Sequence, residues 1–248
     1  QLEVSLRIGW KDTSRLSKIE QGRVGKPTRE TAEKIIKALQ LTDQEKGEFL
    51  FMGGYQPTDS EIKEIIKEFK SKVDSWSYPA YIMDFSWRLL YVNKISISIF
   101  GMDLSWVETI RKNRPNAVEF AFLSSDIRPA EVWKGESKDK LKPLTIAQTA
   151  AFKTETFHYQ SESWYKKTIQ GLMKYDEFRK LWPKIGLEDY HKKLFDYEYK
   201  KIKGVYNGKK KTSNFHIFTT KLINDPRFQI VLYCEAIQEV QRLYYPAQ

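Results

Sequence analysis

The hydrophobic periodicity of this chain changes near Tyr78, and that change limits the possible folds more than any other feature. Before it, apolar residues recur every three or four positions between glycine and proline breaks, which is typical of short amphipathic helices. After it, residues 79–84 and 88–93 are short runs rich in β-branched and aromatic side chains. We therefore predict an α+β protein, in which an all-α domain precedes a domain built on a sheet.

The length of 248 residues is sufficient for two domains that each bury a core. We assign residues 1–57 to the helical domain, 58–77 to a linker helix and 78–248 to the sheet domain. The linker helix carries a stripe of apolar residues at helical spacing, formed by Ile62, Ile65, Ile66, Phe69 and Val73. This stripe fits either a homodimer seam or packing on the next domain, and it is too short to separate the two.

Composition narrows the choice of partners and compartment. The net charge of +10, from 42 basic and 32 acidic residues, favours a polyanionic partner. Cys234 is the only cysteine, so the chain forms no internal disulfide and no cysteine-based zinc site. No run approaches the roughly 18 apolar residues that a membrane helix needs, and the N-terminus has no signal-peptide pattern. We therefore expect a cytoplasmic protein without a membrane partner.

The first 22 residues have the pattern of two short helices joined by a tight turn. Gly9 and Gly22 are placed to end the two helices. Asp12 is placed to cap the second helix, which we expect to begin at Thr13. The pattern therefore predicts a helical hairpin at the start of the chain.

The second of these helices has two contrasting sides. At 100° per residue, Leu16, Ile19 and Glu20 fall on one side. The opposite side is formed by Ser14, Ser17 and Lys18. Such a short, polar, cationic surface fits the major groove of DNA, where hydroxyl groups and a lysine reach base edges. Residues 7–29 hold seven basic and two acidic residues, a net charge of +5, which is half the charge of the chain. The alternative is a solvated hairpin that serves only for packing.

The segment Leu-Ser-Lys-Ile-Glu-Gln-Gly at residues 16–22 resembles the recognition helix of the Xre/Cro/phage-repressor class of helix-turn-helix proteins. The resemblance implies base-reading positions for Thr13, Ser14, Ser17 and Lys18. It also implies phosphate contacts for Gln1 and Arg23. In that class the turn after Gly9 is one residue shorter and another helix precedes the position of Gln1, so the resemblance covers this domain without its first helix. We expect the neighbouring cations to contact DNA as well, namely Lys11, Arg15 and Lys26.

The sheet region carries a second resemblance. The pattern Pro-Ala-x-x-x-Asp-x-x-Trp-x-x-x-x-x-Asn at residues 79–93, followed by Phe-Gly, resembles the ligand-binding domain of MmyB-like transcription regulators, which join it to an Xre-type helix-turn-helix. Residues 176–182 and 228–233 resemble the Phe-Arg-x-Leu-Trp helix and the final strand of that family, in the same order. Residues 196–211 depart from the family, which has a His-Pro-containing stretch there. The resemblance implies a PAS-like domain that binds an apolar, fatty-acid-like molecule.

Three further runs, at residues 197–202, 214–220 and 229–235, have the composition of strands. Together with the two earlier runs they predict a five-stranded antiparallel sheet, covered by the aromatic-rich helices expected at residues 104–185. If a ligand lies between sheet and helices, we expect it to contact Trp106, Phe178, Trp182 and Phe218. The alternative is that these aromatic side chains belong only to the core.

Catalytic and metal-binding patterns are missing from the sequence. The three histidines, His158, His191 and His216, are far apart and lack metal-ligand spacing. No phosphate-binding glycine loop and no Gly-x-Ser-x-Gly motif occurs. We therefore predict that the protein is not an enzyme and has no metal and no cofactor apart from a bound fatty acid as ligand. We interpret the lysines at 209–211 as a solvated hairpin tip.

Two functions remain open. The first is a ligand-responsive transcription regulator that binds double-stranded DNA as a homodimer. The second is a DNA-tethered module for protein interaction or dimerisation without a small-molecule ligand.

Overall fold

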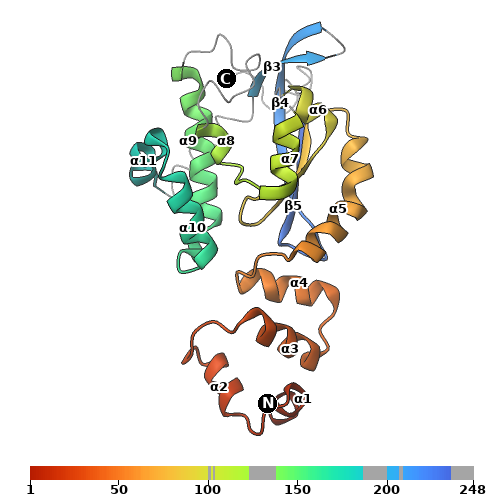
Figure 1. Ribbon diagram of the computed structural model, residues 1–248, viewed down its shortest axis with the longest axis vertical. Coiled ribbons are helices and arrows are strands. Elements are labelled where there is room, and N and C mark those ends of the chain that lie inside the picture. Colours follow the sequence, from red (N-terminus) through yellow and green to blue (C-terminus); the bar gives the residue numbers. More distant parts are fainter. Residues whose placement is uncertain (100–101, 103, 123–137, 187–199, 207–208, 236–248) are drawn as a thin grey trace, which may run out of the picture. The chain divides into compact units, whose positions relative to one another are not determined.

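A computed structural model describes residues 1–99, 102, 104–122, 138–186, 200–206 and 209–235. These residues form helices and a sheet, so the predicted α+β class is confirmed (Figure 1). Contacts divide the chain into two compact units. Unit 1 comprises residues 1–57 and 221–227, and unit 2 comprises residues 58–220 and 228–248. None of the described helices combines the length and the apolar composition that crossing a bilayer requires.

Unit 1 contains four helices: α1 (Leu2–Ile8), α2 (Ser14–Glu20), α3 (Arg29–Leu39) and α4 (Asp43–Met52). α1 packs on α3. α3 and α4 share a core formed by Ala32, Ile36, Leu50 and Tyr55. Thr28 caps α3, because its side chain accepts a hydrogen bond from the N–H of Thr31. Thr42 and Glu45 form a capping box that fixes the start of α4.

α1 and α2 are both followed by a glycine in the left-handed conformation. Gly9 and Gly22 have φ angles of 88° and 64°, a left-handed conformation that favours glycine. After each helix two backbone N–H groups turn back to its last carbonyls, including Trp10 to Ser5 at 2.8 Å and Arg23 to Lys18 at 2.9 Å. The predicted stops at both glycines are therefore confirmed.

The predicted start of the second helix is wrong by one residue. α2 begins at Ser14, and Thr13 occupies the N-cap position. The carboxylate of Asp12 accepts the N–H of Ser14 at 2.8 Å, an Asx-type bond two residues along the chain. This bond satisfies the first free N–H of the helix, so Asp12 supports the helix start from one position further out.

Unit 2 is built on a sheet with strand order β2-β1-β5-β4-β3. The strands are β1 (Ala80–Asp84), β2 (Leu89–Val92), β3 (Lys200–Tyr206), β4 (Lys209–Lys221) and β5 (Phe228–Glu235). β1 pairs antiparallel with β2 and with β5, and β3 pairs antiparallel with β4. α5 (Asp59–Asp74) packs on β1 and β2 and buries Ile62 and Val73.

Two strand predictions need correction. Residues 197–199 lie outside the described part of the chain, and β3 continues to Tyr206. β4 begins at Lys209, five residues before the predicted start. The lysines at 209–211 therefore do not form a hairpin tip, because they pair with residues 206, 205 and 204 of β3. Strand preference depends strongly on context, so backbone pairing outweighs the low intrinsic preference of lysine.

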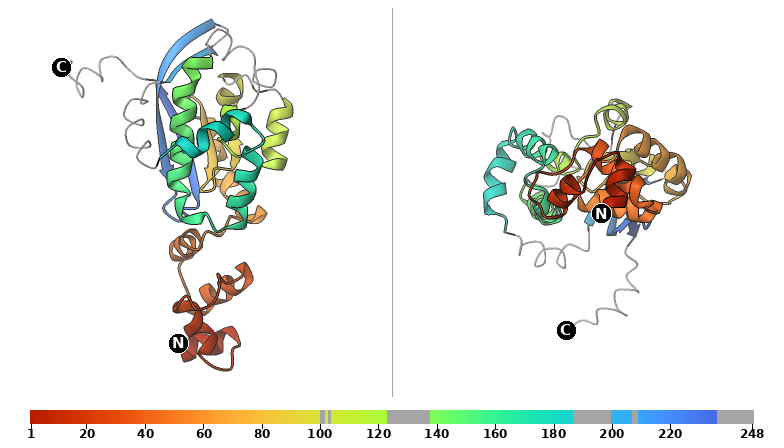
Figure 2. Two further views of the ribbon diagram at one scale, coloured as in Figure 1. Left: turned by 90° about the vertical axis from the view of Figure 1, so that its left-hand side faces the viewer. Right: turned by 90° about the horizontal axis from the view of Figure 1, so that it is seen from below.

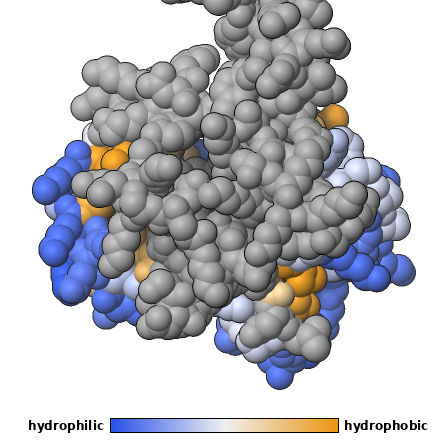
Figure 3. Space-filling model, turned by 90° about the horizontal axis from the view of Figure 1, so that it is seen from above, coloured by the Kyte–Doolittle hydropathy of each residue, from blue (hydrophilic) through white to orange (hydrophobic). Residues whose placement is uncertain are grey.

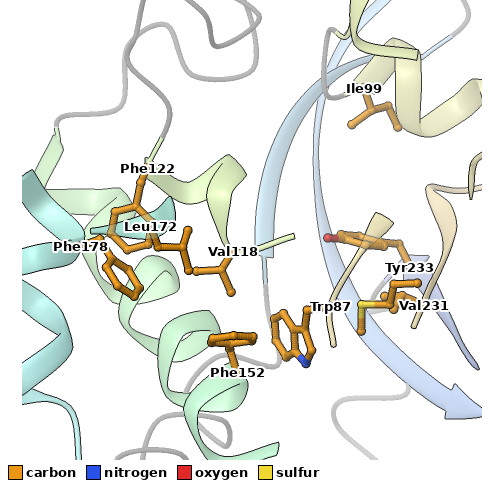
Figure 4. Packing of buried hydrophobic residues seen from close by; sticks show 10 residues of the cluster. Trp87, Ile99, Val118, Phe122, Phe152, Leu172, Phe178, Val231 and Tyr233 are labelled. Atoms are coloured by element: carbon orange, nitrogen blue, oxygen red, sulfur yellow. The ribbon is translucent and has the colours of Figure 1, made fainter. Parts of the chain in front are cut away.

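The remaining helical elements of unit 2 are α6 (Lys94–Ile99), α7 (Leu104–Asn113), α8 (Glu119–Phe122), α9 (Lys138–Glu155), η1 (Phe157–Tyr159), α10 (Ser163–Leu172), α11 (Asp176–Leu181) and η2 (Trp182–Lys184). Figure 2 shows α9 and α10 in front of the sheet. Buried residues from the sheet and from several of these helices form one large cluster, the main core (Figure 4). Its members are Met83, Trp87, Ile99, Val118, Phe122, Phe152, Leu172, Phe178, Val231 and Tyr233.

The turn between β1 and β2 is held by a buried carboxylate. Asp84 is fully buried, and one of its oxygens accepts hydrogen bonds from the backbone N–H and hydroxyl of Ser86 and from the N–H of Arg88. Its other oxygen accepts from Nε of Arg88 at 2.6 Å. Trp87 completes the turn with φ 64°. Asp84 and Trp87 of the MmyB-like pattern therefore serve the shape of this turn.

Replacing Asp84 tests this role. Asp84→Ala leaves three donors of the turn and one guanidinium without their acceptor, so we expect a loss of about 3–5 kcal/mol in the free energy of unfolding. Asp176→Ala is a matched control, because it breaks the exposed ion pair with Arg179 and should cost no more than about 1 kcal/mol. Urea denaturation followed by circular dichroism measures both. Equal losses would contradict the role of Asp84.

Candidate functional site

The predicted DNA-contacting residues lie at the N-cap of α1, on α2 and in the segments that border α2. Seven of them are exposed: Gln1, Lys11, Ser14, Arg15, Lys18, Arg23 and Lys26. Thr13 and Ser17 are half-buried. We call this set, together with the helices that carry it, the basic hairpin.

Burial of one side chain decides which face of α2 is presented to solvent. Leu16 is 6% exposed, whereas Ser14 and Lys18 are exposed. Ile19 is half-buried, so it agrees with the predicted inner side only in part. Glu20 was predicted on the same side as Leu16, but it is exposed, and its carboxylate accepts a hydrogen bond from the side-chain amide of Gln1.

Several side chains of the basic hairpin have partners within unit 1. The guanidinium of Arg15 lies 4.8 Å from the ring centroid of Trp10, a cation–π distance. The hydroxyl of Ser17 accepts a hydrogen bond from the amide of Gln21 at 3.1 Å. Lys26 lies 4.1 Å from the ring centroid of Tyr55. These contacts are at the surface, where such interactions are weak and can be exchanged for contacts with a ligand.

One negative charge stands among the cations. Asp12 is exposed, and hydrogen bonds from the backbone and side chain of Ser14 lower its pKa, with a smaller contribution from the charge of Lys18. The carboxylate is therefore ionised at neutral pH. A polyanion that binds α2 must accommodate this charge, which opposes phosphate groups near the start of the helix.

Two of the four predicted ligand-contacting aromatic residues lie together in unit 2. Phe178 on α11 is fully buried in the main core, and its ring stacks on that of Trp182 with centroids 5.1 Å apart. Phe178 also meets Phe122 edge to face at 5.2 Å (Figure 4). Trp182 in addition lies 6.2 Å from Phe152.

The other two lie elsewhere. Trp106 on α7 is half-buried, and its ring centroid is 4.7 Å from that of Phe120. Phe120 packs on a separate cluster of Leu89, Val92 and Ile110. Phe218 on β4 is 56% exposed. The structure therefore brings Phe178 and Trp182 together and places Trp106 and Phe218 apart from them.

The main core also contains polar groups that sequence reasoning missed. The hydroxyls of Tyr81 and Tyr233 are hydrogen-bonded to each other, and burial raises the pKa of Tyr81 to about 12. Nearby, Nε1 of Trp87 donates to a carboxylate oxygen of Glu155 at 2.9 Å. Tyr81 and Tyr233 become neighbours because β1 pairs with β5, and the sequence alone gives no register for that pairing.

Figure 3 shows one face of the molecule, on which the described residues are mainly hydrophilic with small, separate hydrophobic areas. Among the described residues no group of three or more histidine, cysteine or acidic side chains is arranged to hold a metal ion. No protein-family model matches this chain, and comparison with curated proteins finds no similar sequence.

The left-handed stop at Gly22 gives a test of the basic hairpin. Gly22→Ala places a Cβ at φ 64°, so we expect a loss of about 1–2 kcal/mol in stability and fraying at the end of α2. Gly25→Ala is the matched control, since Gly25 lacks a left-handed φ and an added Cβ meets nothing within 4 Å. Thermal unfolding compares the variants. A Gly22→Ala protein as stable as Gly25→Ala would contradict this account of the helix end.

Proposed function

We propose that this protein is a ligand-responsive transcription regulator whose unit 1 binds double-stranded DNA. The basic hairpin carries the proposal, because α2 is anchored by the buried Leu16 and presents Ser14, Arg15 and Lys18 to solvent. A net charge of +5 over residues 7–29 supplies the long-range attraction to a polyanion.

In the proposed complex α2 lies in the major groove. Lys18 reaches the base edges, with guanine O6 and N7 as its preferred acceptors, while the hydroxyls of Ser14 and Ser17 bond to neighbouring bases. Arg23 follows the helix end and contacts phosphate, which fixes the register of the helix without reading sequence. Arg15, whose guanidinium lies against the ring of Trp10, makes a second phosphate contact in this proposal.

Unit 2 is the proposed sensor. The MmyB-like resemblance implies an apolar, fatty-acid-like ligand. Trp182 is only half-buried, and its ring stacks on that of Phe178, so Trp182 is the aromatic side chain beside the main core that we propose contacts such a ligand. The hydroxyls of Tyr81 and Tyr233 supply polar groups of the kind that fix the end of such a molecule. The proposal assigns no catalytic step to the protein.

We further propose a homodimer, since helix-turn-helix dimers meet two half-sites about one helical turn apart. Ile62 and Val73 of α5 are buried within unit 2, so this part of the apolar stripe is already covered. A dimer seam on α5 would therefore use the half-buried Ile65, Ile66 and Phe69.

A second candidate is a DNA-tethered interaction module without a small-molecule ligand. Phe152, Phe178 and Leu172 are no more than 2% exposed, so protein atoms alone bury this part of the main core. A filled interior is what the second candidate requires.

Two substitutions separate base reading from phosphate contact. With a duplex enriched by the protein from a random pool, Lys18→Ala should weaken specific binding by about 1–3 kcal/mol and relax the preference at one base pair. Arg23→Ala should weaken binding to all sequences and reduce the slope of log K against log salt by about one. Fluorescence anisotropy over a salt series measures both effects.

Lys34→Ala is the charge-matched control, because Lys34 lies on α3 and pairs with Glu30 at 2.7 Å. It should bind the duplex with nearly the affinity of the unmodified protein. Salt-insensitive binding that neither Lys18→Ala nor Arg23→Ala changes would remove the proposed DNA interface.

Palmitate tests the sensor. At about 100 times its Kd it should stabilise the protein by about 2.7 kcal/mol and so raise the melting temperature, and it should change the affinity for the enriched duplex. A raised melting temperature with unchanged affinity would keep the ligand site and exclude regulation. No thermal effect, together with no small molecule in the mass spectrum of a denatured extract, would favour the interaction module.

A further inference from the structure

A glycine in the middle of α4 marks an unusually close approach. A Cβ atom added at Gly47 would lie 2.6 Å from the carbonyl oxygen of Asn224 and 2.8 Å from Cα of Asp225. Both are backbone atoms, so no side-chain movement can make room. Glycine inside a helix costs about 1 kcal/mol of stability relative to alanine. The close contact with residues 221–227 explains why glycine nevertheless occupies this position, because any larger residue would clash.

The segment Lys221–Arg227, which we call the docking loop, has a structure of its own. Arg227 is only 1% exposed, and its Nε and Nη2 donate to the two carboxylate oxygens of Asp225 at 2.9 and 2.7 Å. Such a forked ion pair is rigid, and a buried guanidinium requires it. Lys221 lies 4.7 Å from the ring centroid of Phe51 on α4. The docking loop is therefore an integral part of unit 1, in agreement with the contacts that define the unit.

The same loop joins two strands of the sheet in unit 2. β4 ends at Lys221, and β5 begins at Phe228, which is fully buried and pairs with Asp84 of β1. β5 lies between β1 and β4, and it contributes Val231 and Tyr233 to the main core. A change in the position of β5 therefore passes directly, along the chain, to Arg227.

α4, which contacts the docking loop, is linked to the basic hairpin through α3. Leu50 of α4 is fully buried against Ala32 and Ile36 of α3, and α3 packs on α1. A movement of α4 therefore disturbs a packed core that also positions α1. Packed cores respond to such movement by shifting between discrete arrangements.

We propose that the docking loop, seated on α4 at Gly47, is the connection through which the sheet of unit 2 and the DNA-binding helices of unit 1 influence each other. The regulatory part of this inference rests on the proposed function. Coupling between two sites is reciprocal, so DNA bound to unit 1 must stabilise β5 as much as a change at β5 alters DNA binding.

Gly47→Ala tests the docking loop without DNA. Alanine has a higher helix propensity than glycine, yet its Cβ forces the docking loop away from α4. We therefore expect trypsin to cleave after Arg227 about tenfold faster. This factor corresponds to a loss of about 1.4 kcal/mol in the free energy of loop docking. We also expect the unmodified protein to unfold in one thermal transition and Gly47→Ala to unfold in two. Gly171→Ala in α10 is the matched control, because its added Cβ meets nothing within 4 Å.

Hydrogen exchange with a 30-base-pair duplex then tests the coupling. In the unmodified protein and in Gly171→Ala, DNA should slow exchange in both α2 and β5, and in Gly47→Ala only in α2. Asp225→Ala removes the carboxylate that accepts hydrogen bonds from Nε and Nη2 of Arg227, and it adds no clash. It should behave like Gly47→Ala and replaces it if that variant does not fold.

The outcomes separate the two proposals. If DNA protects neither α2 nor β5, the DNA-binding function fails, and the proteolysis and unfolding results still decide whether the loop connects the units. If Gly47→Ala only raises stability, with slow cleavage after Arg227 and protection of β5 unchanged, the inference is overturned.

Discussion

The side chain of Asn93 joins the elements on which unit 2 depends. It is fully buried at the end of β2, and its amide nitrogen donates to the carbonyls of Val73 and Tyr78 at 3.2 and 2.8 Å. Its oxygen accepts the N–H groups of Ala80 and Ser96. One amide thus connects the end of α5, the start of β1 and the start of α6, and it uses nearly all of its hydrogen-bonding capacity. Because unsatisfied buried polar groups are costly, this network permits only one arrangement of these elements.

Features of the fold that depend on a few neighbouring residues could be predicted from the sequence. The stops at Gly9 and Gly22 depend on chemistry within one helical turn, and the structure confirms both. The position of Leu16 and the helical period correctly predicted that Leu16 is buried and that Ser14 and Lys18 are exposed, whereas Ser17 is half-buried and Glu20 is exposed. For the same reason the candidate DNA interface is the part of the site that the sequence describes best.

Features that depend on distant parts of the chain could not be predicted. Lys209 was placed outside a strand, because only its pairing with Tyr206 reveals the ladder. Trp106, Phe178, Trp182 and Phe218 all looked alike as aromatic residues, yet the tertiary structure places two of them in one cluster and leaves Phe218 exposed. No local pattern distinguishes Gly47 from a tolerated helical glycine, since its neighbour Asn224 lies 177 positions further along the chain.

In the proposed regulator, DNA recognition depends on contacts between residues close in sequence, whereas control by unit 2 depends on contacts between residues far apart in sequence. Recognition uses α2 and its neighbours, whose geometry is set by short segments with their own capping residues, so it can be kept through many changes elsewhere. The proposed control depends on the pairing of β5 with β1 and on the contacts of the docking loop with α4, and each of these contacts joins residues far apart in sequence. Substitutions in the docking loop should therefore weaken coupling before they weaken DNA binding, because a coupling free energy of 1–3 kcal/mol is small beside the energy that holds a folded helical core.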